Sequence, residues 1–160
     1  MNWRKFEAAA PELAALGRER FEATGVALLG TLRADGAPRI NPVEPYIAAG
    51  HLLLGLLPWS KKARDLLRDP RCTVHSSVSD VEGTEGEFKL YGRAHEVSDD
   101  GVRAAPEQAW WRSRPVEDAR VFALEIDAAA FVSWNATAAE MTVRRWSPER
   151  GLTTESRKYP

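Results

Sequence analysis

The chain has 160 residues, of which 44% are hydrophobic and 28% are charged, and its formal net charge at pH 7 is −1. This length and composition are typical of one globular domain. The balanced charge argues against general binding to nucleic acid or to an acidic membrane surface. No apolar run approaches the roughly 20 residues needed to cross a bilayer, and the N-terminus lacks the apolar core of a signal peptide. The single cysteine, Cys72, excludes an internal disulfide and fits a reducing environment, so we expect a cytoplasmic protein.

The first part of the chain predicts a helical segment at 1–23, followed by strands. Pro11 predicts a break or a second helix start, because proline does not fit the interior of a helix. Residues 26–32 form a short apolar run, which we expect to be a strand buried on both faces. The Asp-Gly pair at 35–36 is a strong turn signal and predicts that 38–43 returns as the partner strand.

The middle of the chain predicts a second hairpin and two further strands. The hairpin joins 46–48 to 51–57 through an Ala-Gly turn, and the further strands are predicted at 71–78 and 87–97. Apolar and polar residues alternate in the last of these, so one face of that strand is expected to be buried. An acidic loop that contains glycine, residues 79–86, connects the two strands.

The C-terminal part carries weaker strand signals. Residues 98–119 are expected to be helical or irregular, and the Trp-Trp pair at 110–111 is expected to pack on the body of the protein, on a ligand or on a partner subunit. A long strand is predicted at 120–131 and a last one at 141–146, followed by a polar tail at 147–160. Closely spaced strands, with one helix at the start and one inserted between strands, predict a small antiparallel barrel.

The inserted helix is the most informative stretch, and it is predicted at 61–67. Ser60 is a good N-cap, because its hydroxyl can accept a backbone N–H that the first helical turn leaves unpaired. Lys61, Lys62 and Arg64 fall in the first turn, where the helix dipole is already positive and acidic residues are the usual choice. Free N–H groups, a hydroxyl and two ammonium groups together make a good phosphate site. The alternative is a solvated helix end whose lysines point at water.

Four short motifs share an order and spacing along the chain: GAPR at 36–39, SKKA at 60–63, DPR at 69–71 and LYGRA at 90–94. With the apolar hairpin between the first two motifs, this pattern resembles the pyridoxamine 5′-phosphate oxidase-like family of flavoproteins. The resemblance covers about half of the chain. It implies a mainly β fold, an antiparallel and Greek-key-like FMN-binding split β-barrel with an N-terminal helix and a helix inserted between strands.

The resemblance also implies a domain organisation and an assembly. The whole chain, residues 1–160, would form one split-barrel domain whose barrel spans 24–146. Members of the family are usually homodimers with cofactor sites at the interface, so we expect a homodimer. Exposed aromatic surface at Trp110, Trp111 and Trp134 gives a second reason to expect a covered face.

Carried over by position, the resemblance implies eight cofactor-binding residues: Arg39, Asn41, Pro42, Val43, Leu56, Ser60, Lys61 and Lys62. The serine and the two lysines would hold the FMN phosphate. The strand segment 39–43 would line the isoalloxazine ring and the ribityl chain, and Arg39 could also reach the phosphate. From the residues alone, Arg39 is a surface strand residue. Leu56 stands where FMN-binding members often carry a hydroxyl, which removes one hydrogen bond.

Departures from the family pattern limit the expected function. Pro42 and Glu44 stand where pyridoxamine phosphate oxidase itself has apolar and basic residues, and its C-terminal substrate signature is not found in 131–146. The resemblance therefore implies an FMN-dependent oxidoreductase that moves hydride through flavin N5, to or from an unknown small molecule. One alternative is an F420-dependent reductase on the same fold, in which Arg64 or Arg68 meets the acidic tail of that deazaflavin. The other is a non-enzymatic flavin- or haem-binding sensor or storage protein.

No catalytic side chain and no metal site are predicted. His51, His75 and His95 are dispersed, and neither H-x-x-x-H nor C-x-x-C occurs. The G-x-S-x-G pattern of hydrolases does not occur either, and Cys72 at a strand start is expected to be a core residue. The expected partners are a small-molecule substrate and a second copy of the chain, without nucleic acid or membrane.

Overall fold

The structure is a computed structural model that describes residues 1–113 and 119–158. Its helices are α1 (Trp3–Ala9), α2 (Pro11–Thr24), α3 (Lys61–Arg68), α4 (Asp100–Ala104) and α5 (Trp110–Ser113). Its strands are β1 (Ala27–Leu32), β2 (Pro38–Val43), β3 (Pro45–Ala48), β4 (His51–Leu56), β5 (Arg71–Ser76), β6 (Glu87–Glu96), β7 (Arg120–Asn135), β8 (Glu140–Ser147) and β9 (Gly151–Lys158). None of the described helices is long and apolar enough to cross a membrane.

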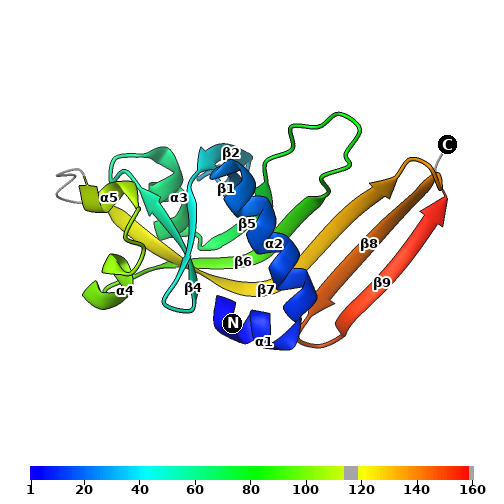
Figure 1. Cartoon of the computed structure of the whole chain (residues 1–160). Helices are drawn as coiled ribbons and strands as arrows, with labels where there is room; N and C mark the ends of the chain where they lie inside the picture. The colour runs from blue at the N-terminus through cyan, green and yellow to red at the C-terminus, as the bar shows by residue number, and fades with distance from the viewer. Residues whose placement is uncertain (114–118, 159–160) are drawn as a thin grey trace.

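The strands form one antiparallel sheet in the order β2-β1-β5-β6-β7-β4-β3, to which β8 and β9 are added on β7 (Figure 1). The hydrogen-bonded path ends at β2 and β3, so the sheet curls without closing, as in a split barrel. Both predicted hairpins are present, with Leu32 opposite Pro38 in one and Ala48 opposite His51 in the other. The mainly β, antiparallel architecture predicted from the sequence is therefore confirmed.

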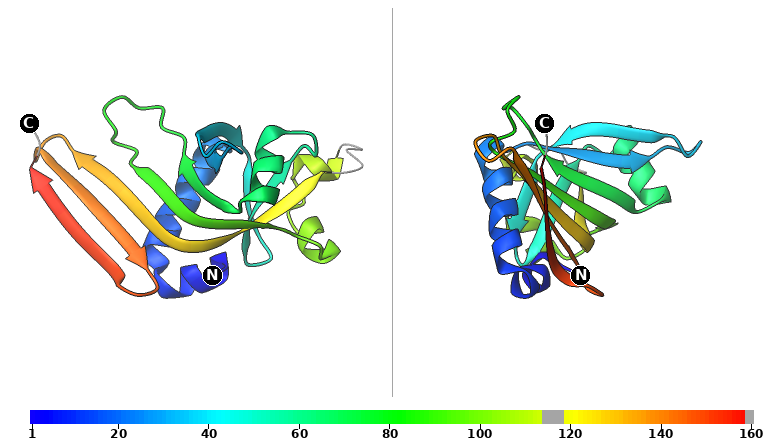
Figure 2. Two further views of the ribbon diagram at one scale, coloured as in Figure 1. Left: turned by 180° about the vertical axis from the view of Figure 1, so that it is seen from behind. Right: turned by 90° about the vertical axis from the view of Figure 1, so that its right-hand side faces the viewer.

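The N-terminal helices cover one side of this sheet (Figure 2). Helix α1 ends at Ala9 and α2 begins at Pro11, so the break predicted at this proline is confirmed. Trp3 and Phe6 of α1 are buried, and the Phe6 ring lies edge-on to Trp146 of β8 with their centroids 5.1 Å apart. The first helices thereby fasten the beginning of the chain to its C-terminal half.

Strand β1 differs from the prediction that it is buried on both faces. Ala27 and Leu29 are fully buried, whereas the side chain between them, Leu28, is 39% exposed. Only one face of β1 meets the core, and the other face is left open on the outside of the sheet. A continuous apolar run therefore did not distinguish a strand buried on both faces from one whose outer face carries an exposed apolar surface.

The C-terminal residues also differ from the prediction. Strand β8 is not the last strand, and the expected polar tail at 147–160 contains β9, which pairs with β8 from Ser147 opposite Gly151 to Glu140 opposite Lys158. This hairpin projects from the body of the molecule (Figure 1). All residues of β9 are exposed. The backbone pairing with β8 defines this strand, and its exposed side chains show no apolar alternation that would have predicted it.

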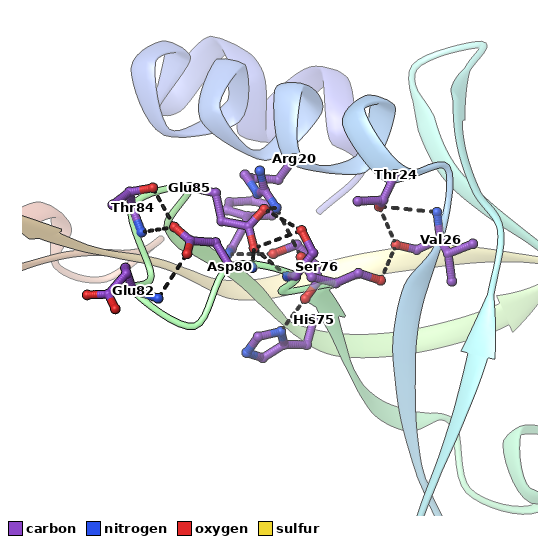
Figure 3. Close-up of polar contacts among 12 residues, drawn as sticks. Arg20, Thr24, Val26, His75, Ser76, Asp80, Glu82, Thr84 and Glu85 are labelled. Atoms are coloured by element: carbon purple, nitrogen blue, oxygen red, sulfur yellow. Dashed lines mark hydrogen bonds and ion pairs between the residues drawn. The ribbon is translucent and has the colours of Figure 1, made fainter.

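The acidic loop between β5 and β6 is fastened to α2 (Figure 3). Arg20 of α2 donates to the Glu85 carboxylate at 2.5 Å and to the Ser77 carbonyl at 3.0 Å. Glu85 also accepts backbone N–H groups of Ser79 and Asp80. These backbone hydrogen bonds, with the Arg20 contact, lower the pKa of Glu85 to about 2. The loop is thus held in one shape by a charged network at its base.

Candidate functional site

The first turn of α3 has the geometry that its sequence predicts. Ser60 is extended and its Oγ accepts the Ala63 backbone N–H at 3.3 Å, while its carbonyl accepts the Arg64 N–H at 3.2 Å. Helix geometry leaves the N–H groups of Lys61 and Lys62 without an intrahelical acceptor. The turn therefore presents free donors at the positive end of the helix dipole, which favours an anion.

A cavity of about 640 Å³ lies beside this turn, between the end of β2, β4 and α3. Five of the eight predicted cofactor residues line it: Asn41, Pro42, Val43, Ser60 and Lys62. We call it the main cavity. Residues 41–43 are separated in the chain from Ser60 and Lys62 by the β3–β4 hairpin, so their meeting in one wall is a property of the fold.

Lys62 ties α3 to β2 at the wall of the main cavity. Its Nζ donates to the Pro42 carbonyl at 2.7 Å, which uses one of the three donors of the ammonium group. Desolvation lowers the pKa of Lys62, and the nearby negative charge of Glu44 offsets part of that effect. The remaining donors of a partly dehydrated ammonium are available for a phosphate oxygen.

The predicted phosphate residues do not all meet in the main cavity. Lys61 and Arg39 line a separate pocket of about 340 Å³, together with Arg33, Arg64 and Arg68. We call this the basic pocket. Consecutive helical residues point about 100° apart, so neighbouring lysines at the start of α3 face different sides. In this structure Lys61 and Arg39 therefore lie in the wall of a different pocket from Ser60 and Lys62.

Asp65 organises the basic pocket, and sequence reasoning missed it. Its buried carboxylate accepts Arg39 Nε at 2.6 Å, Thr31 Oγ1 at 3.0 Å and Arg68 Nη1 at 3.4 Å. Burial by itself would raise the pKa of Asp65, but the hydrogen bonds from Arg39 and Thr31 and the charge of Arg39 outweigh burial and lower it. Its position one turn after Lys61 was visible in the sequence, whereas its partners on β1 and β2 were not.

Leu56 does not offer its side chain to either cavity. It is buried in the hydrophobic core, and its backbone pairs with Arg120 of β7. Any role of this position in cofactor binding would therefore have to come from its main chain. Asn41 lines the main cavity, and its amide nitrogen donates to the carbonyl of the preceding Ile40.

The two adjacent tryptophans of α5 have different positions. Trp111 packs on the barrel, where its ring lies so close to Gly55 that a Cβ at that glycine would come within 2.1 Å of it. Its Nε1 donates to the Arg103 carbonyl at 3.0 Å, and its ring lies edge-on to Tyr46. Trp110 lines the main cavity. Packing on the body of the protein is thus confirmed for Trp111, and Trp110 adds an aromatic surface to the candidate site.

Glu44 and Tyr46 form a polar pair beside the main cavity. Desolvation and the charge of Glu44 raise the pKa of Tyr46. The Tyr46 hydroxyl therefore stays protonated at neutral pH.

The histidines and the cysteine have the structural positions that the sequence suggests. His75 has its Nδ1 2.6 Å from the Ser76 carbonyl and its Nε2 3.5 Å from the Glu87 carboxylate. Burial raises the pKa of the Cys72 thiol to about 12. Across residues 1–113 and 119–158, no group of three His, Cys, Asp or Glu side chains is placed to hold a metal ion.

The chain belongs to the pyridoxamine 5′-phosphate oxidase family, because residues 15–142 match the sequence profile of that family. The chain has no match among curated proteins. The fold is shared with several solved structures at low sequence identity. An FMN-binding, pyridoxamine 5′-phosphate oxidase-related protein from Nostoc punctiforme is 10% identical with a TM-score of 0.63, covering 94% of this chain and 96% of its own.

Two other solved structures show the range of ligands named for this fold. A heme-binding protein from Mycobacterium smegmatis is 17% identical with a TM-score of 0.62, covering 91% of this chain and 88% of its own. PhzG from Burkholderia lata, in complex with tetrahydrophenazine-1-carboxylic acid, is 12% identical with a TM-score of 0.63, covering 98% of this chain and 93% of its own. At these identities the likeness shows the fold alone.

Proposed function

We propose that this chain binds FMN in the main cavity and works as an oxidoreductase on a small molecule. The observation that carries this proposal is the convergence of residues 41–43 with Ser60 and Lys62 around one cavity of about 640 Å³. Bound FMN supplies the redox chemistry, because hydride enters and leaves through its N5 atom. The family membership supports a flavin, and hydride transfer through N5 requires no acidic or basic side chain of the protein.

The residues of the main cavity have distinct tasks in this proposal. Lys62 and the first-turn N–H groups bind the phosphate, with the Ser60 hydroxyl close by. The segment 41–43 orients the ring and ribityl chain through its backbone and apolar side chains. Trp110 covers the cavity and excludes water from it.

Paired lysine variants test this assignment. Lys62→Ala should weaken FMN binding by about 1.5–3 kcal/mol, the range for a hydrogen bond to a charged group, and should leave riboflavin binding unchanged. Lys61→Ala removes the same charge from the basic pocket and should have a smaller effect. Dissociation constants are measured by flavin fluorescence. An equal loss of riboflavin affinity, or an unchanged FMN affinity in Lys62→Ala, would contradict the phosphate assignment.

A deazaflavin, F420, is the second candidate cofactor. Arg64 and Arg68 both line the basic pocket next to the first turn of α3, and they are the cations that would meet a longer acidic tail. If F420 is the cofactor, it should saturate the purified protein at concentrations where FMN does not. Arg64→Ala should then weaken F420 binding and leave FMN binding unaffected.

A haem-binding sensor or storage protein is the third candidate, favoured by the fold shared with the mycobacterial heme-binding protein. His75 lines an apolar cavity of about 590 Å³ on the outer face of the sheet. Both of its ring nitrogens have protein neighbours, which disfavours it as an axial ligand. A titration with haem, monitored by absorption in the wild type and in His75→Ala, tests this candidate.

We also propose that the chain acts as a cytoplasmic homodimer, with a second copy on the outer face of the sheet. Leu28, Ile40 and Tyr91 on this face are 39%, 67% and 43% exposed and line the same apolar cavity. Apolar patches of this kind mark contact surfaces. Light scattering should give twice the chain mass for the wild type and one chain mass for Ile40→Asp.

A further inference from the structure

We propose that Trp111 is a positioning residue of the candidate site: it occupies a socket at Gly55 and thereby holds Trp110 as a fixed aromatic wall of the main cavity. This inference deepens the proposed function and rests on it, because the main cavity is the proposed FMN site. Trp110 lines that cavity, and Trp111 acts on the site through its neighbour.

The socket lies on the outward side of β4, where the sequence has a glycine. The flanking Leu54 and Leu56 belong to the hydrophobic core, and side chains alternate along a strand, so position 55 points away from the core. The Trp111 ring fills that position, because its Cε3 and Cζ3 atoms would lie 2.1 and 2.3 Å from a Cβ at Gly55. Any side chain here would displace the ring, which explains a glycine in the interior of a strand.

A small apolar layer surrounds the socket, separate from the main core. Leu53 and Val121 are fully buried, although neither belongs to the core cluster. They share a face of the sheet with Gly55, because Leu53 is two residues away on β4 and Val121 is the β7 residue opposite Gly55. Helices α4 and α5 lie at this end of the sheet, where β7 begins (Figure 1). Trp111 is therefore part of the layer that covers this outer face.

Two further contacts fix the Trp111 ring. Its Nε1 donates to the Arg103 carbonyl at 3.0 Å, and its ring lies edge-on to Tyr46 of β3, with the centroids 5.1 Å apart and the planes at 84°. Arg103 is itself fixed, because its guanidinium donates to the Val97 and Ala119 carbonyls at 3.3 and 2.9 Å. The indole is thus held by β3, β4 and α4 at once.

Trp110 is coupled to this anchor in two ways. It is the preceding residue of the same helix, and its ring lies edge-on to Trp111 with the centroids 5.8 Å apart. A helix of four residues has too few hydrogen bonds to keep its own shape, so the anchored Trp111 fixes the position of Trp110. Trp110 and Gly55 both line the main cavity, so the socket and the wall that it fixes border the same space.

A fixed indole at this wall shields a bound flavin from water without an ordering step. Aromatic side chains bury a large apolar area, and a group that is already in place loses little conformational freedom when a ligand binds. Loosening the anchor should therefore increase the access of solvent to the flavin and weaken its binding, although no ligand contact of Trp111 is removed.

A pair of glycine variants tests the inference on the FMN-loaded protein. Gly55→Ala fills the socket, whereas Gly30→Ala of β1 adds the same methyl group where the nearest atom outside the neighbouring residues lies 3.7 Å away. The rate at which dithionite bleaches the flavin absorption reports access to the ring, and fluorescence titration gives the dissociation constant. We expect Gly55→Ala to raise the rate about threefold and the dissociation constant about fivefold, and Gly30→Ala to leave both unchanged.

Further variants show whether Trp111 acts through Trp110. Trp110→Ala should accelerate bleaching by itself, and adding Gly55→Ala to it should cause no further change, because the wall is already lost. Trp111→Ala empties the socket instead of filling it, so it tests the same contact if Gly55→Ala does not fold. Trp111→Phe keeps an aromatic ring without the hydrogen bond to Arg103 and should lie between the wild type and Trp111→Ala.

The outcomes separate the two proposals. If the wild-type protein does not bind FMN, the proposed function fails and the inference fails with it. If FMN binds and both Gly55→Ala and Trp111→Ala behave like Gly30→Ala, the inference alone is overturned. Additive effects of Gly55→Ala and Trp110→Ala would overturn it as well. Faster bleaching in Gly55→Ala, with no added effect in the Trp110→Ala background, establishes the positioning role.

Discussion

Two carboxylates in this protein each hold an arginine that lies far away in the sequence, and they do so in different surroundings. Asp65 on α3 holds Arg39 of β2, and its side chain is 5% exposed. Glu85 in the loop after β5 holds Arg20 of α2, and its side chain is 16% exposed. Both carboxyl groups have a lowered pKa. The two clusters therefore look alike chemically, although Asp65 lines the basic pocket and Glu85 does not.

The partners of the two carboxylates explain the difference in role. Asp65 receives side-chain donors only, from Arg39, Thr31 and Arg68, so it fixes the side chains that line the basic pocket. Glu85 receives backbone N–H groups of its own loop besides Arg20, so it fixes a main-chain shape (Figure 3). A lowered pKa by itself does not distinguish a site from a structural anchor, and the identity of the donors does.

The largest expected effect is that of Asp65→Ala. Arg39 and Thr31 would both lose a buried partner, which should lower the free energy of unfolding by about 2–3 kcal/mol, somewhat less than for a fully buried pair because Arg39 is partly exposed. Denaturant unfolding measures this loss. The control Asp127→Ala removes the exposed partner of Arg93 and should change stability by less than about 1 kcal/mol. Equal effects of the two variants would show that Asp65 has no special structural role.

The second expected effect is that of Glu85→Gln on the loop. Stability should fall by less than in Asp65→Ala, and amide hydrogen exchange should accelerate in 79–86, because the charge that holds these N–H groups is lost. FMN affinity should stay unchanged, since no residue of this network lines the main cavity. A loss of FMN affinity in Glu85→Gln would contradict the distinction between the two clusters.

The third prediction concerns acid pH. A carboxyl group whose pKa is lowered on folding stabilises the protein fully above its unfolded pKa and loses that contribution as the pH falls through its folded pKa. For Glu85 this interval runs from its usual pKa of 4.5 down to about 2. Unfolding curves of the wild type should therefore lose stability below pH 4.5. The loss should be smaller in Glu85→Gln, and an identical pH profile for both proteins would remove Glu85 as a source of acid sensitivity.

The smallest effect is expected for Asp69→Asn. Arg71 donates to Asp69 through its side chain and backbone, and these hydrogen bonds hold the pKa of Asp69 at about 2. The pair is nevertheless on the surface, where solvent screens it. The thermal unfolding midpoint should stay within experimental error of the wild type. A clear drop would show that a surface carboxylate can stabilise the fold as Asp65 does.

The sequence was informative wherever a structural signal is local. The Asp-Gly turn at 35–36, the break at Pro11 and the cap at Ser60 each depend on residues within one turn of each other, and all are present in the structure. Strand β9 was missed because its exposed side chains have no apolar alternation and only its backbone pairs with β8. The exposed face of β1 was missed because an apolar residue gives the same hydropathy signal whether it packs in the core or lies on the outer surface.

The candidate site shows where the sequence stops being sufficient. By itself, the sequence determined the split-barrel family, the anion-attracting first turn of α3 and the segments that line the main cavity. Only the tertiary structure decided that Lys61 and Lys62 face different cavities and that Asp65 holds Arg39. The physical reason is that a side chain's charge and hydrogen bonding depend on neighbours that are distant in the chain, and folding alone brings those neighbours together.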